Sequence, residues 1–135
     1  MTVVSNADFA SRVLGLAQNA PPFRPTAHYD PDGDCIEFLA APDPFYGERV
    51  DDLLTVYYSQ ESRQIIGSLI KGVRGLLKRH PGLNIEIQDG RVRLVHLLRA
   101  SFWNKDQPQP VEVRTYRKLI EVAEAANVET ELAAV

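Results

Sequence analysis

The feature that most constrains this chain is a pair of strand–turn–strand patterns, at residues 28–39 and 53–71. In the first, the sequence Asp-Pro-Asp-Gly-Asp at residues 30–34 separates two short apolar stretches, and polar residues 59–63 do the same in the second. Proline, glycine and aspartate favour tight turns, while the flanking β-branched and aromatic residues suit a pleated, half-buried surface. Both patterns therefore predict antiparallel hairpins, and neither indicates a particular chemistry.

The size and composition of the chain predict one globular domain over residues 1–135. Its 44% hydrophobic and 24% charged residues are ordinary for a folded protein, and domains commonly contain roughly 100–150 residues. The single cysteine, Cys35, excludes an internal disulfide framework and favours a reducing compartment. No apolar run approaches the roughly 20 residues of a membrane span, and no secretory signal pattern is present. We therefore expect a cytoplasmic protein with no membrane partner.

Local patterns predict an α+β fold with an antiparallel sheet of four to five strands packed by two to three helices. The expected strands are residues 35–39, 53–58, 64–70, 83–88 and 91–98. Asp89-Gly90 provides the positive backbone angles of a two-residue turn, so residues 83–98 are the clearest predicted hairpin.

Apolar residues at helical spacing predict three helices. They lie at about residues 6–18, within residues 70–79, and at about residues 111–126. Prolines and a glycine in residues 40–52 predict a loop with Phe45 and Tyr46 exposed at its tip, and residues 129–135 are expected to form a frayed tail.

Residues 28–38 resemble the opening of the small bacterial family called domain of unknown function 2283, which begins with a Tyr-Asp-Pro turn followed by a strand. Val56-Tyr57-Tyr58 and the later Gln64-Ile65-Ile66-Gly67 are similar to its second hairpin and its strand-ending glycine. The resemblance covers about residues 28–73. It implies a bacterial protein with that hairpin fold, and it implies no activity. It does not explain the helix within residues 70–79 or anything that follows.

No catalytic motif is present, so we assign no catalytic residue and no cofactor. Asp30, Asp32 and Asp34 alternate like the start of a calcium loop, but Cys35 and Ala41 occupy the positions that need glycine and glutamate, which excludes an EF-hand. A weaker cation site in the acidic turn at residues 30–37 is left open. The enzyme alternative is a metal-assisted hydrolase, and its candidate residues are His28, Asp30, Asp32 and Asp34.

Charge is unevenly distributed along the chain. Residues 30–61 contain nine acidic side chains against Arg49 alone, and residues 71–99 are mainly basic. The basic segment offers an alternative function in nucleic-acid binding, through Lys71, Arg74, Lys78, Arg79, Arg91 and Arg93. The acidic pI of about 5.6 argues against this alternative.

The remaining features favour a small, non-enzymatic interaction or regulatory module that acts through a protein partner and forms a homodimer. Phe45, Tyr46 and Trp103 are predicted to bind the partner, because large aromatic side chains near element ends often anchor interfaces. Edge strands of a small sheet also invite pairing between subunits. For Phe102 and Trp103, packing into the core is the alternative to an interface role.

Overall fold

The computed structural model describes residues 22–103 and 105–132. Five strands form one antiparallel sheet in the order β1-β2-β5-β4-β3. These strands are β1 (Thr26–Asp30), β2 (Cys35–Leu39), β3 (Phe45–Arg49), β4 (Leu54–Ser59) and β5 (Ile65–Lys71). The predicted α+β class is confirmed. The helix predicted at about residues 6–18 lies outside the described residues.

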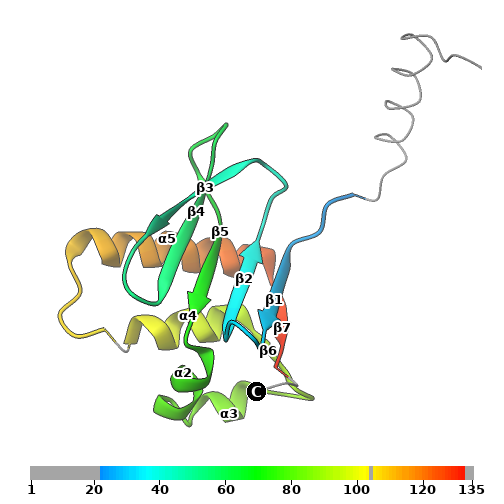
Figure 1. The fold of residues 1–135 in the computed structure, drawn as a ribbon, viewed down its shortest axis with the longest axis vertical. Coiled ribbons are helices and arrows are strands. Elements are labelled where there is room, and N and C mark those ends of the chain that lie inside the picture. Colours follow the sequence, from blue (N-terminus) through cyan, green and yellow to red (C-terminus); the bar gives the residue numbers. More distant parts are fainter. Residues whose placement is uncertain (1–21, 104, 133–135) are drawn as a thin grey trace, which may run out of the picture.

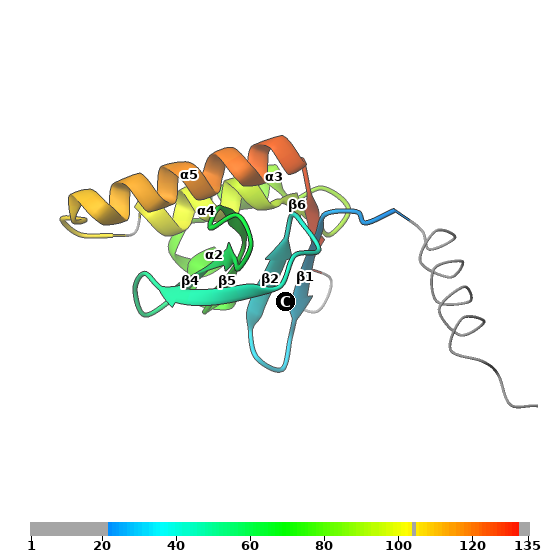
Figure 2. The same ribbon diagram turned by 90° about the horizontal axis from the view of Figure 1, so that it is seen from above.

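The helices lie on one side of this sheet or beyond its end (Figures 1 and 2). In the described part of the chain they are α2 (Val73–Arg79), α3 (Leu83–Glu86), α4 (Leu94–Trp103) and α5 (Pro110–Ala126). The long helices α4 and α5 cover one sheet face, and α2 and α3 follow the end of β5. A short antiparallel ribbon of β6 (Arg91–Arg93) and β7 (Glu129–Glu131) lies beside the sheet edge formed by β1.

The hydrophobic core fills the space between the sheet and the two long helices. Alternate residues of the central strands point toward the helices, as strand geometry requires. The largest fully buried side chains include Ile36, Phe38, Leu54 and Ile70 from strands, and Leu97, Leu98, Tyr116 and Leu119 from helices. The opposite face of every strand therefore points away from this core.

Most predicted element positions in the first hairpins and the last helix are confirmed. The strand at residues 35–39 matches β2, and the strands at 53–58 and 64–70 are each displaced by one residue. The helix at about residues 111–126 corresponds to α5, which begins one residue earlier at Pro110. The short helix expected within residues 70–79 forms at Val73–Arg79.

The hairpin predicted over residues 83–98 is wrong. The Asp89-Gly90 turn forms with positive φ at both residues, but it closes only the isolated bridge between Gln88 and Arg91. Residues 83–86 form α3, and the apolar run from Leu94 continues as α4. An apolar run suits a buried helix as well as a strand, and here packing against α5 decides in favour of the helix.

Two segments predicted to lack regular structure form strands instead. Residues 45–49, expected to belong to a loop over residues 40–52, form the edge strand β3, because the prolines of the segment lie before it and Gly47 is tolerated at an edge. Residues 129–131, expected to belong to a frayed tail, form β7, because they pair with β6. β3 forms by adding to β4 at the edge of the sheet, and β7 forms by pairing with β6, which is distant in sequence.

Candidate interaction surface

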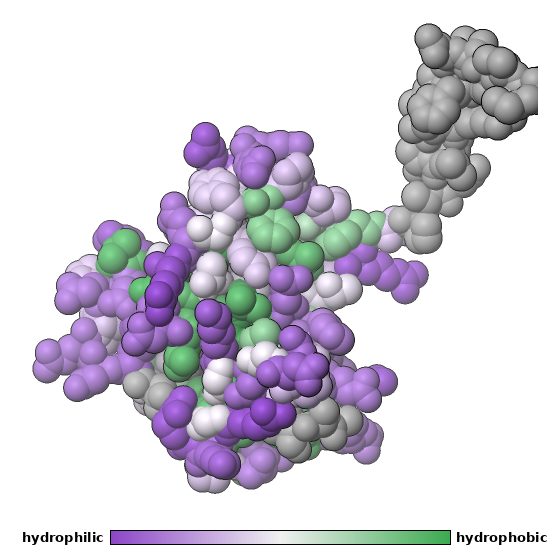
Figure 3. Space-filling model, in the orientation of Figure 1, coloured by the Kyte–Doolittle hydropathy of each residue, from purple (hydrophilic) through white to green (hydrophobic). Residues whose placement is uncertain are grey.

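The sheet face opposite α4 and α5 is not covered by any described helix or strand (Figures 1 and 2). We call it the open sheet face, with a centre formed by Leu39, Phe45, Tyr57 and Leu69. Leu39 and Leu69 are half-buried, and Phe45 is 38% exposed. In the space-filling view of this face, apolar side chains gather over the middle of the sheet and hydrophilic side chains surround them (Figure 3).

Tyr57 organises the centre of the open sheet face. Its register partners are Gly47 on β3 and Gly67 on β5, so its ring lies between two strands that lack side chains at these positions. The Phe45 ring stacks on it with 4.4 Å between the ring centroids. The Tyr57 hydroxyl donates a 3.1 Å hydrogen bond to Oε2 of Glu37. The resulting surface is aromatic at its middle and carries a carboxylate at its border.

Two groups on this face have raised pKa values. Burial, together with the neighbouring Glu37 carboxylate, raises the pKa of Tyr57 to about 12. Burial and nearby Asp30 and Asp34 also raise the pKa of the Cys35 thiol. Both groups are therefore protonated at neutral pH, and a protonated thiol is a poor nucleophile.

The three predicted partner-binding residues lie on different surfaces. Phe45 belongs to the open sheet face, whereas Tyr46 points to the other face and stacks on Tyr58 with 5.7 Å between the centroids. Trp103 lies at the end of α4 and is 79% exposed. Phe102, its neighbour, packs on Tyr116 beside the core. The structure thus gives Phe102 a core position and leaves Trp103 exposed and separate from Phe45.

The six basic residues of the nucleic-acid alternative form two groups, one on β5 and α2 and the other on β6. Lys71 ends β5 and is followed by Arg74, Lys78 and Arg79 on α2. Arg91 and Arg93 are on β6, where they are register partners of Glu131 and Glu129. A polar groove of about 590 Å³ along this ribbon also includes Glu86, Asp89 and His96. Carboxylates therefore lie close to Arg91 and Arg93.

The acidic turn uses its side chains within the fold. Asp34 accepts hydrogen bonds from the Tyr29 hydroxyl, at 2.8 Å, and from the backbone N–H of Arg74, at 3.0 Å. Asp30 accepts one from the backbone N–H of Asp32. Across residues 22–103 and 105–132, no three His, Cys, Asp or Glu side chains converge in a way that could hold a metal ion. The predicted cluster of His28, Asp30, Asp32 and Asp34 is thus not brought together as a ligand set.

A polar network on the helical side connects the sheet to α4 and α5. Oδ1 of Asp51 accepts hydrogen bonds from the backbone N–H groups of Leu53 and Leu54, and Oδ2 accepts from Nζ of Lys105 at 2.8 Å. The Tyr116 hydroxyl, which lies 3.1 Å from Oγ of Ser101, also donates to Oδ2. Lys105 forms a second ion pair with Glu112.

The charges of this network stabilise one another. Burial alone would raise the pKa of Asp51, but hydrogen bonds from Lys105, Leu53 and Leu54 outweigh it and lower the pKa. Burial would likewise lower the pKa of Lys105, yet its bonds to Asp51 and Glu112 raise it. Burial raises the pKa of Tyr116 to about 12. The network has the character of a structural ion pair.

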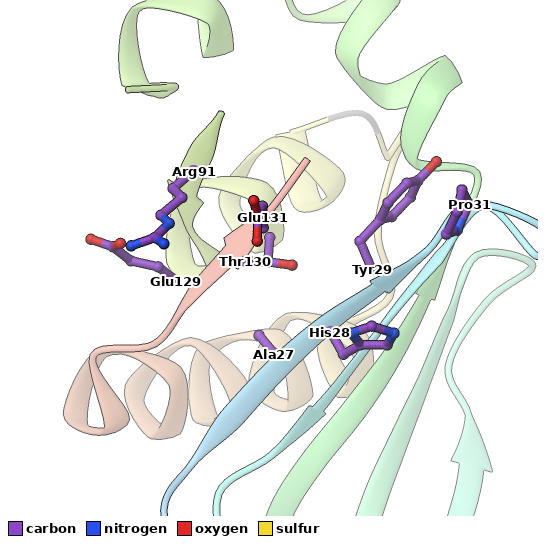
Figure 4. A pocket seen from close by; sticks show the side chains of 8 residues that line it. All are labelled: Ala27, His28, Tyr29, Pro31, Arg91, Glu129, Thr130 and Glu131. Atoms are coloured by element: carbon purple, nitrogen blue, oxygen red, sulfur yellow. The ribbon is translucent and has the colours of Figure 1, made fainter. Parts of the chain in front are cut away.

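A groove of about 470 Å³ separates β1 from the β6–β7 ribbon (Figure 4). It is lined by Ala27, His28, Tyr29, Pro31, Arg91, Glu129, Thr130 and Glu131. In Figure 4 the Thr130 side chain points toward β1, and Arg91 and Glu129 lie together on the other side of β7. The β6–β7 ribbon shields this edge of the sheet, because it lies alongside β1. It forms no ladder hydrogen bonds to β1.

Comparison with family models, curated proteins and solved structures found no match for this chain. None of the described helices combines the length and the hydrophobicity needed to cross a membrane.

Sequence reasoning missed most of the open sheet face. It selected Phe45 but neither Tyr57 nor the flanking Leu39, Leu69 and Glu37. A signal was available, because side chains alternate between the two faces along a strand. Glu37 therefore lies on the face opposite that of the core-facing Ile36 and Phe38. What the alternation could not provide was the strand order, which brings β2, β5, β4 and β3 together.

Proposed function

We propose that this protein is a non-enzymatic interaction module that binds an amphipathic segment of a protein partner on the open sheet face. The observation that carries the proposal is a partly exposed apolar patch, formed by Leu39, Phe45 and Leu69 around the buried Tyr57, on a sheet face that no described element covers. Contiguous apolar surface with a polar border is characteristic of interaction sites. A setting in the bacterial cytoplasm is part of this proposal, and it fits the free thiol of Cys35.

The composition of the face indicates the chemistry of the partner segment. Leu39 and Leu69 offer aliphatic contacts on the β5 side of Tyr57, because Leu39 and Tyr57 are both register partners of Gly67 and Leu69 is two residues further along β5. Glu37 is exposed and no Lys, Arg or His nitrogen of the described chain forms an ion pair with it. The partner is therefore expected to present apolar side chains and a lysine or arginine toward Glu37.

The hydrogen-bond states of the surrounding groups support binding over catalysis. Tyr57 acts as a hydrogen-bond donor to Glu37, and its raised pKa keeps the proton on the hydroxyl. The Asp51–Lys105 pair is satisfied internally and lies on the helical side. Neither group offers an unoccupied base next to a nucleophile, which nucleophilic catalysis requires.

The test is a selection of displayed amphipathic helices against the full-length chain, with Leu69→Glu as the counter-target. We expect binders with apolar residues at helical spacing and at least one basic residue, and an affinity reduced at least tenfold by Leu69→Glu and by Glu37→Lys. Ile85→Glu is the matched control, because Ile85 is an exposed apolar residue on α3, away from this face. Thermal unfolding of each variant verifies that the fold is retained.

Two results would contradict the proposal. One is a selection that yields no binder sensitive to Leu69→Glu in folded protein. The other is a photocrosslinker at position 69 that reacts only with residues 6–18 of its own chain or with a second copy, which would assign the open sheet face to an internal or self-association role.

A further inference from the structure

We propose that the β3 edge binds a second copy of this chain, in an antiparallel two-fold pairing centred on Gly47, so that two five-stranded sheets become one. This inference does not depend on the partner proposed for the open sheet face. It concerns the backbone edge of the sheet, and of the four residues at the centre of the open sheet face it involves only Phe45.

The β3 edge is the accessible edge of the sheet. Within the described chain β3 pairs only with β4, whereas the other edge strand, β1, has the β6–β7 ribbon alongside it. Four of the five β3 residues are exposed. The strand contains no proline or lysine, and its two charged residues, Glu48 and Arg49, have opposite signs and lie on opposite faces of the sheet.

The direction of the β3 backbone groups determines which residues can pair. The N–H of Val50 donates to the Leu54 oxygen, and the N–H of Gln60 donates to the Pro44 oxygen. Because hydrogen-bonded positions alternate along an antiparallel strand, Tyr46 and Glu48 also face β4. The backbone groups of Phe45, Gly47 and Arg49 consequently point to the free edge.

A two-fold axis at Gly47 uses all of these outward groups. In this register Gly47 is opposite Gly47 of the second copy, and Phe45 is opposite Arg49 of the second copy on both sides. Each of these three pairs is of the type that exchanges two hydrogen bonds, which makes six across the axis. Centring the axis on Phe45 or Arg49 would leave part of the edge unused, and centring it on Tyr46 or Glu48 would oppose backbone groups that face β4.

The side chains are self-complementary in the same register. On the open sheet face, Arg49 lies next to the exposed Phe45 ring of the second copy, an arrangement that favours contact between a guanidinium and an aromatic face. On the other face, Tyr46 lies opposite Glu48 of the second copy, so unlike groups meet and no like charges are directly opposed. The sequence Phe-Tyr-Gly-Glu-Arg thus reads as complementary to itself.

Three contacts of the single chain must rearrange. Nε2 of Gln60 donates to the Phe45 oxygen at 3.3 Å, Nε of Arg49 donates to the Asp51 oxygen at 3.2 Å, and Arg49 forms an ion pair with Asp52 at 3.0 Å. All three are made by exposed side chains, so contacts to the second copy can replace them. Gly47 at the axis leaves the two backbones free to approach.

The experiment combines sedimentation velocity over a range of concentrations with disulfide trapping. The full chain is expected to show a concentration-dependent dimer, and Gly47→Pro is expected to weaken it at least tenfold while retaining one cooperative thermal transition. The Thr55 methyl, 3.0 Å from a Cβ at this position, must shift slightly. Proline removes an outward N–H and is tolerated at edges. Leu69→Glu is expected to leave the dimer intact, so this inference and the proposed function can fail separately.

Trapping tests the register in a Cys35→Ser background. Gly47→Cys is expected to form a disulfide between copies, because residues in a hydrogen-bonded antiparallel pair have Cα atoms about 5.5 Å apart. Glu48→Cys is the matched control and is expected to remain reduced. A monomer at every concentration, a dimer that Gly47→Pro does not affect, or preferential trapping through Glu48→Cys would overturn the proposal.

Discussion

At the scale of a residue, the absence of a side chain at Gly67 allows β2 and β5 to approach closely beside the Tyr57 ring. A Cβ at this position would lie 2.1 Å from the Phe38 carbonyl oxygen and 3.2 Å from the Tyr57 ring. The carbonyl belongs to the neighbouring strand and cannot move without displacing the ladder. The glycine is therefore required by a close backbone contact, and Tyr57 covers the surface that it leaves.

Gly67→Ala is expected to reduce the free energy of unfolding by about 3 kcal/mol, because the methyl group must displace a backbone oxygen inside a packed sheet. Urea unfolding followed by circular dichroism measures this change. Gly82→Ala is the matched control, since a Cβ there meets nothing within 4 Å and the residue has helical dihedral angles. Equal stability of the two variants would show that the sheet relaxes around position 67.

At the scale of an element, α5 ends in a way that directs the chain into β7. Asn127 adopts the left-handed conformation with φ 51°, and its N–H donates to the Ala123 and Glu124 oxygens. The next residue, Val128, is buried, and its oxygen accepts from the N–H of Leu94 at the start of α4. The chain changes direction after Asn127, and this change places β7 beside β6.

The helix end predicts opposite effects for two substitutions at one site. Asn127→Gly is expected to retain or slightly raise stability, because glycine adopts positive φ without a steric cost. Asn127→Ala is expected to lower the free energy of unfolding by about 1 kcal/mol, since alanine is disfavoured in the left-handed region. Thermal unfolding of both variants provides the measurement. A more stable alanine variant would contradict this reading of the cap.

The predictability of individual elements follows their dependence on distant partners. The spacing of Val113, Tyr116 and Ile120 was sufficient to predict α5, because an amphipathic helix shows its period locally. The segment from Leu94 was misread because a continuous apolar run has no decisive period. Strands β3 and β7 were missed because each is short and depends on pairing.

At the scale of the whole molecule, the Asp51 network connects the sheet half to the helical half. The carboxylate precedes β4, Lys105 lies between α4 and α5, and Tyr116 belongs to α5. Both ionised partners are largely shielded from solvent, with 20% and 15% of their side chains exposed. Loss of one partner leaves the other charge with fewer compensating contacts.

The network predicts how stability depends on pH. The pKa of Asp51 is lowered by folding, so its contribution is complete above its ordinary value of 3.8 and is lost as the pH falls through the lower folded value. The pKa of Lys105 is raised, so its contribution is complete below its ordinary value of 10.5 and is lost as the pH rises through the folded value. Stability from this pair is therefore expected to be full between these limits.

Asp51→Asn is expected to lower the free energy of unfolding by about 3 kcal/mol at neutral pH and to reduce the loss of stability on acidification. Urea midpoints between neutral pH and about pH 3 measure both effects. Asp52→Asn is the matched control, because Asp52 is 96% exposed and its ion pair with Arg49 is at the surface. If Asp51→Asn loses as much stability on acidification as the unsubstituted chain, that loss is caused by other carboxylates.

The sequence by itself determined the α+β class, the β2, β4 and β5 strands, the Asp89-Gly90 turn and α5, because each depends on turn chemistry or on a period within one segment. The tertiary structure alone decided the strand order, the pairing of β6 with β7, and the meeting of Tyr57, Phe45, Leu39 and Leu69 on one face. Such contacts join residues that are far apart along the chain. Their free energy depends on which surfaces are buried together, and local patterns contain no record of that choice.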